Sequence, residues 1–141
     1  MKTELQTTGT QRSLQQLVSN LVNNFLPAAH RNNTQLVNEV RQEIALGKSV
    51  TQSTIAVMSD LLSTVIINSK NGEIHISAER FSNTVTLEIQ ERNNYNGYAL
   101  AFSVGAIEPL AHSFGGHIRI NGPQKRVATI SFSFPDQLVA A

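Results

Sequence analysis

The chain has 141 residues, enough for one domain with its own hydrophobic core. A net charge of +1 and a charged fraction of 15% provide no field that would attract nucleic acid or an anionic membrane, and the absence of cysteine excludes disulfides and thiolate metal sites. No apolar run approaches the roughly 18 residues of a membrane helix, and the N-terminus lacks the apolar segment of a signal peptide, so we expect a cytoplasmic setting without membrane or nucleic-acid partners.

A polar tail and an amphipathic helix open the chain. Residues 1–12 are polar and expected to be loose. Ser13 is a plausible N-cap, and apolar residues then recur at helical spacing as far as Phe25. Pro27 is expected to end this helix, because a residue that precedes proline is pushed away from helical angles.

A short extended segment and a second helix follow. The periodicity after the first helix is ambiguous, and we interpret residues 35–40 as extended, with a break at Gly47. Thr51 or Ser53 can cap the second helix, which is expected to end near Asn68. Its apolar residues form a broad stripe on a 3.6-residue period: Ile55, Val57, Met58, Leu61, Leu62, Val65 and Ile66.

Alternating residues then predict an antiparallel hairpin with one buried face. Asn71-Gly72 is a turn signal before the first strand, and Ser82-Asn83 turns the chain into the second. The buried positions are Ile74, Ile76 and Ala78, then Val85, Leu87 and Ile89. His75 is expected to point away from the core, and no histidine in the chain has metal-ligand spacing.

The last part of the chain predicts a third helix and two strands. The inward positions of the helix are Leu100, Val104, Ile107, Leu110 and Ala111, and Gly115-Gly116 ends it. Pro109 removes a helical N–H, so we predict either a kink or two short helices joined near residues 105–107. The strands contain Ile118 and Ile120, and then Ile130, Phe132 and Phe134.

Helices interleaved with antiparallel strands predict an α+β fold. We expect a two-layer sandwich, with a mixed, mostly antiparallel sheet and helices on one face. The predicted organisation is a tail and helix over residues 1–30, a domain over 31–135 and a C-terminal tail over 136–141.

Four segments resemble the GHKL-type ATPase domain of sensor histidine kinases. Residues 59–68 resemble its N-box helix, and residues 97–102 its second glycine box. Residues 113–120 resemble its helix-to-strand turn, and residues 129–135 its last strand. The resemblance implies the same architecture, with ATP and magnesium as cofactors if the pocket still functions.

In the resembled family an N-box asparagine coordinates magnesium, and that position is Thr64 here, a weaker neutral ligand. The earlier asparagine of the box falls on Asp60, which would be the general base of an active domain. The basic residue of the family falls on Ile67, and Asn68 lies one turn beyond Thr64, where it would substitute as a metal ligand. Against this, Asp60 and Asn68 are also interpreted as solvated helix residues.

The family's glycine boxes are mostly replaced. Glu91 retains the acceptor for the adenine amino group, although a lone Glu at a strand end is more often a surface residue. Asn93 replaces the first glycine, Gly97 remains, and Ala99 replaces the following glycine. Only three residues separate Asn93 from Gly97, a span of about 10 Å, which is too short for a lid over a triphosphate.

Two hypotheses follow from the resemblance. The first is a degenerate domain with weak or no ATP binding that acts by protein contacts in two-component-like signalling. Its partner would be a response regulator or another signalling protein, and the helix over residues 13–25 would be a dimer helix or the remnant of a kinase linker. The alternative is an active ATP-binding domain of a histidine kinase or an anti-sigma-type protein kinase.

Overall fold

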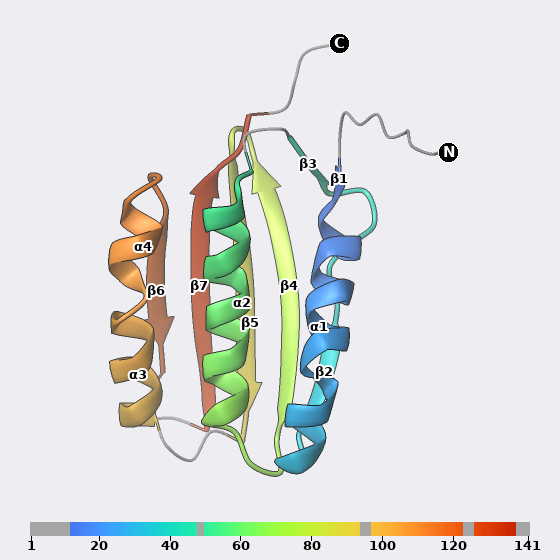
Figure 1. Cartoon of the computed structure of the whole chain (residues 1–141), viewed down its shortest axis with the longest axis vertical. Helices are drawn as coiled ribbons and strands as arrows, with labels where there is room; N and C mark the ends of the chain where they lie inside the picture. Colours follow the sequence, from blue (N-terminus) through green and yellow to red (C-terminus); the bar gives the residue numbers. More distant parts are fainter. Residues whose placement is uncertain (1–11, 48–49, 94–96, 123–125, 138–141) are drawn as a thin grey trace.

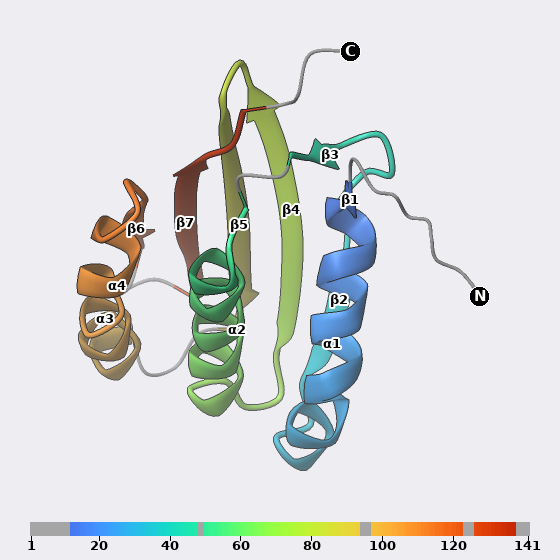
Figure 2. The same cartoon turned by 45° about the horizontal axis from the view of Figure 1, so that its top comes forward.

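The computed structural model describes residues 12–47, 50–93, 97–122 and 126–137. Helices cover one face of a five-stranded sheet and leave the other face open, which confirms the predicted α+β sandwich (Figures 1 and 2). The strand order is β2-β4-β5-β7-β6, and within it β2 and β4 are parallel while the other pairs are antiparallel. The elements are β1 (Arg12–Ser13), α1 (Leu14–Arg31), β2 (Gln35–Asn38), β3 (Ala45–Leu46), α2 (Gln52–Ile67), β4 (Glu73–Phe81), β5 (Thr84–Arg92), α3 (Gly97–Gly105), α4 (Glu108–His112), β6 (His117–Asn121) and β7 (Val127–Pro135).

Helix α1 begins at the predicted cap but does not end at Pro27. The Ser13 hydroxyl accepts a hydrogen bond from the Gln16 N–H, and the helix continues through Pro27 to Arg31. Its last turn is held by tertiary contacts: Ala29 is fully buried, and the Asn32 side-chain amide donates to the Ile66 carbonyl at 2.8 Å. These contacts outweigh the cost of a proline inside a helix, so the predicted end was wrong.

The apolar stripe of α1 is used within the molecule. Its buried residues belong to the same core as the sheet residues, and they are Leu14, Val18, Leu21 and Ala29. The apolar stripe of α1 therefore packs against the rest of the chain, as in an amphipathic helix at the surface of a globular domain.

The start of the chain pairs with a later segment. Arg12 and Ser13 form β1, which pairs antiparallel with β3 so that Arg12 lies opposite Leu46. The expectation of a loose tail is therefore wrong at Arg12, and residues 1–11 lie outside the described part. Strand β2 confirms the predicted extended segment.

Helix α2 and the β4–β5 hairpin confirm their predictions. Thr51 caps α2 by accepting a hydrogen bond from the Thr54 N–H at 3.3 Å, and Asn68 is the C-cap residue. Ser82 has a φ of 60° at the hairpin turn. His75 lies on the open face of the sheet, between the buried Ile74 and Ile76.

The third helical segment is broken where we predicted. Helix α3 ends at Gly105, α4 begins at Glu108, and Pro109 lies in the first turn of α4, where a missing N–H breaks no helical bond. Leu110, predicted to face inward, is 38% exposed, so that prediction was wrong, because the break at residues 105–108 interrupts the helical period on which it was based. None of the described helices is long and apolar enough to cross a lipid bilayer.

Candidate functional site

Glu91 is a carboxylic acid buried on the helix-covered face of the sheet. It continues the inward alternation of Val85, Leu87 and Ile89 along β5 and is 1% exposed, so its interpretation as a surface residue was wrong. Neither of its carboxylate oxygens makes a hydrogen bond of regular geometry with the described residues, and the Ser69 hydroxyl lies near them. Burial raises the pKa of the Glu91 carboxyl to about 7, and the Ser69 hydroxyl opposes this shift.

Two buried hydroxyls belong to the same end of the sheet. The hydroxyls of Thr34 and Ser69 lie 3.2 Å apart, and both residues are buried. Gly72 closes this region: a Cβ atom there would lie 3.0 Å from the Ser69 Oγ and 2.7 Å from the Arg92 carbonyl oxygen. The α2–β4 connection therefore lies directly against the end of β5. Sequence reasoning missed Ser69 and Thr34, because no local pattern marks a polar residue that tertiary contacts bury.

The candidate residues of α2 lie in different environments. Asp60 is exposed and Thr64 is half-buried, while Ile67 is 68% exposed. The Asn68 side-chain amide donates to the Thr64 backbone carbonyl at 2.9 Å and so satisfies the end of its own helix.

The candidate residues after β5 hold neighbouring chain segments. Asn93 has a φ of 69°, consistent with its place at a predicted glycine position. Its amide donates to the Asn71 carbonyl at 3.1 Å, and its side-chain oxygen accepts from the Arg126 guanidinium. Gly97 is buried at the start of α3, and Ala99 is half-buried.

The described residues do not fit a magnesium site. Among them, no three histidine or carboxylate side chains gather where one cation would reach them all. Thr64 and Asn68 are neutral, and because the Asn68 Nδ2 donates to the Thr64 carbonyl, only the Asn68 Oδ1 could serve as a ligand. A hard divalent cation prefers several oxygen ligands that include carboxylates. We therefore derive no chemical step through magnesium.

Comparisons with known proteins show the fold. No family model and no curated protein matches the sequence. The nucleotide-free catalytic domain of histidine kinase ThkA superposes with a TM-score of 0.71 at 14% identity, covering 91% of this chain and 95% of that domain. Full-length ShkA in complex with AMPPNP gives a TM-score of 0.70 at 13% identity, covering 99% of this chain and 33% of ShkA. ThkA in complex with the response regulator TrrA gives 0.65 at 17% identity, covering 91% of this chain and 42% of that one.

This chain therefore has the fold of histidine kinase catalytic domains, as its resemblance to GHKL-type ATPase domains implied. Identities this low do not assign the individual site residues, so their roles stay predictions.

Proposed function

We propose that this chain is a degenerate histidine-kinase-type ATPase-like domain that acts in signal transduction by protein contacts, without ATP turnover. The observation that carries this proposal is the chemistry of the two polar residues at the C-terminal end of α2. Thr64, a neutral hydroxyl, stands at the magnesium position of the resembled family, and the Asn68 side chain that would replace it is held at the end of its own helix by the hydrogen bond from its Nδ2 to the Thr64 carbonyl.

The proposed partner is a response regulator or another signalling protein. Support comes from the shared fold, because ThkA, a kinase of that fold, forms a complex with the response regulator TrrA. A second copy of the chain is a further proposed partner. We also propose a cytoplasmic setting, and an ATPase-like domain over residues 31–135 that lies between a tail and helix over residues 1–30 and a C-terminal tail over residues 136–141.

Isothermal titration with ATP and with AMPPNP, each with and without magnesium, tests the loss of nucleotide handling. We expect no micromolar, magnesium-dependent binding. A Thr64→Asn variant is the matched comparison, because it restores the amide ligand of the resembled family. Micromolar binding by the unmodified chain that requires magnesium would contradict the proposal.

Glu91 favours a second candidate function, an active or ATP-binding domain. A buried carboxyl without a hydrogen bond of regular geometry is costly, and an amino group of a bound purine would supply a donor. In that function Glu91 would bind adenine, Asn68 would bind the metal and Asp60 would be the general base.

Phosphotransfer from radiolabelled ATP to a response regulator separates the two functions. Transfer by the unmodified chain that is lost in Asp60→Ala and Asn68→Ala would establish the second. If nucleotide binds without transfer, and Glu91→Gln weakens that binding, then the pocket persists while turnover is lost.

A further inference from the structure

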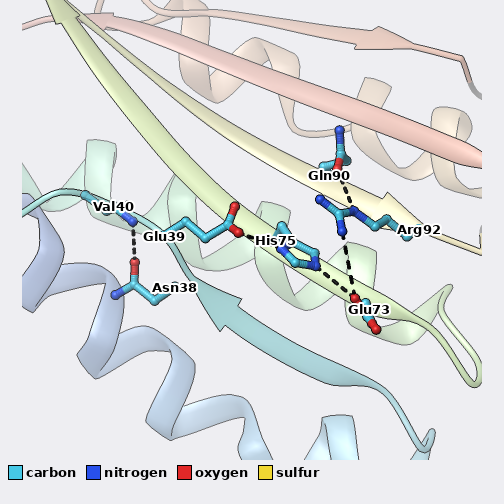
Figure 3. Close-up of polar contacts among 7 residues, drawn as sticks. All are labelled: Asn38, Glu39, Val40, Glu73, His75, Gln90 and Arg92. Carbon is cyan, nitrogen blue, oxygen red and sulfur yellow. Dashed lines mark hydrogen bonds and ion pairs between the residues drawn. The ribbon is translucent and has the colours of Figure 1, made fainter.

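A histidine on the open face of the sheet is held between two carboxylates. The Nδ1 atom of His75 lies 2.9 Å from the Glu39 Oε2, and its Nε2 atom lies 3.0 Å from the Glu73 Oε1 (Figure 3). The His75 side chain is only 12% exposed, whereas the two carboxylates are about half exposed. Both ring nitrogens are therefore directed at acceptors.

Only the imidazolium form of His75 can donate to both carboxylates at once. A neutral imidazole carries one N–H, so it can donate to only one of the two carboxylates and turns a lone pair toward the other. The protonated ring carries two N–H groups and satisfies both. Protonation of His75 therefore decides whether one carboxylate or both are bonded.

The clamped carboxylate lies at the end of an edge strand. Glu39 directly follows β2, the outermost strand on its side, and its backbone N–H donates to the Ile76 carbonyl at 2.7 Å. The preceding Asn38 points to the other side: its side-chain amide donates to the Ser19 hydroxyl at 2.9 Å and to the Gln15 carbonyl at 3.2 Å. The end of β2 thus joins α1 to the sheet.

We propose that Glu39, His75 and Glu73 form a pH-sensitive latch that fastens the end of β2 to β4 while His75 is protonated and loosens it when the ring is neutral. The latch lies on the sheet face opposite the helices and does not depend on nucleotide binding.

The surrounding charges set the pH range of the latch. The hydrogen bond with Glu73, and then that with Glu39, raises the pKa of His75 above 6.5, while partial burial and Arg92 oppose the shift. The hydrogen bond with His75 lowers the pKa of Glu73 below 4.5. Arg92 reaches across from β5, with its guanidinium 4.0 Å from the Glu73 carboxylate and its Nε donating to Gln90 at 2.8 Å (Figure 3).

The directions of the two pKa shifts define the pH range over which the latch contributes to stability. The stability that a raised histidine pKa contributes is fully present below pH 6.5 and is lost as pH rises through the folded-state value. The contribution of Glu73 is present above pH 4.5 and is lost as pH falls through its lowered value. The latch is therefore closed between these limits and opens as pH rises through the folded-state pKa of His75, which lies above 6.5.

Two NMR measurements on the intact chain test the latch: the titration of the His75 ring, and hydrogen exchange of the Glu39 backbone N–H. As pH rises through the His75 titration, we expect protection of this N–H, corrected for intrinsic exchange, to fall by about tenfold. In Glu39→Gln, the His75 pKa should fall and the pH dependence of protection should flatten.

His75→Gln and His117→Gln form a matched pair, since His117 also lies on a strand but has no carboxylate contact among the described residues. Protection of the Glu39 N–H should become independent of pH in His75→Gln and stay as in the parent chain in His117→Gln. If His75→Gln fails to fold, the Glu39→Gln comparison decides. A Glu39 N–H whose protection does not follow the His75 titration would overturn the latch.

Discussion

At the scale of single residues, Glu91 opposes the stability of the fold that buries it. An ionised carboxylate loses its hydration in an apolar environment, and here the nearby Ser69 hydroxyl does not make up for that loss. The group therefore keeps its proton to a higher pH, with a pKa near 7. The presence of a side chain that destabilises the free protein would be explained if that side chain bound a partner or a ligand.

Glu91→Gln makes this cost measurable. The folded state binds the Glu91 proton more tightly than the unfolded state, so the parent chain should lose about 1–2 kcal/mol of unfolding free energy between pH 5 and pH 8. The neutral amide of Gln does not titrate, so the variant should lose less unfolding free energy than the parent over the same range and keep the loss that His75 contributes as pH rises through its raised pKa. Urea denaturation followed by circular dichroism at several pH values measures both curves.

Glu88 provides the control for this experiment. It lies on the same strand but is exposed on the open face, so Glu88→Gln should keep the pH dependence of the parent chain. If Glu91→Gln shows the same loss between pH 5 and pH 8 as the parent, another group is responsible for it.

At the scale of elements, two prolines show what sequence patterns can and cannot predict. Pro109 breaks the third helical segment as its chemistry predicts, because few contacts favour a continuous helix at the exposed Gly105. Pro27 obeys the same local rule, yet α1 continues past it, since the buried Ala29 and the bond from Asn32 to Ile66 stabilise the last turn. The cost of a proline inside a helix is the same at both positions, and the difference lies in the tertiary contacts that stabilise the helix around Pro27.

This contrast predicts opposite outcomes for one substitution. Pro27→Ala restores an N–H in the middle of α1, and Pro27 is exposed, so no cavity forms. We expect a gain of about 1–2 kcal/mol in unfolding free energy, the restored helix bond outweighing the looser unfolded chain. Pro109→Ala restores an N–H that has no helical acceptor and should be neutral or slightly destabilising, by at most about 1 kcal/mol. Thermal and urea denaturation of the two variants give the comparison, and equal effects would remove the explanation.

At the scale of the whole molecule, the helix and sheet layers can be predicted from the sequence, whereas the contacts that join distant segments cannot. Period-2 and period-3.6 patterns within each segment are enough to place β4, β5, β7 and α2 and to assign their buried faces. The pairing of β1 with β3, the burial of Ser69 beside Glu91 and the contact of His75 with Glu39 each join residues more than 20 positions apart. No local period carries such information, so the candidate site was predicted by resemblance at Glu91 and missed at its neighbours.

One such set of tertiary contacts joins three distant segments through Asp136. This residue is 1% exposed, and its carboxylate accepts from the Gly47 N–H at 2.8 Å and pairs with the Arg80 guanidinium. Arg80 also donates to the Asp136 carbonyl at 2.7 Å and to the Ala45 carbonyl at 2.8 Å. The segment after β7 is thereby tied to β4 and to the connection that follows β3.

Removing this carboxylate should therefore weaken the whole fold rather than one end of it. Asp136→Ala leaves the Arg80 charge, only 15% exposed, without its carboxylate partner and the Gly47 N–H without its acceptor, and we expect a loss of about 3–5 kcal/mol. Asp136→Asn keeps an acceptor oxygen and should cost less, and Asp60→Ala on the exposed face of α2 should stay within about 0.5 kcal/mol of the parent. Urea denaturation at pH 7 compares the three. A loss below about 1 kcal/mol in Asp136→Ala would mean that the segments hold together without this contact, and that the sheet and helices alone supply the stability.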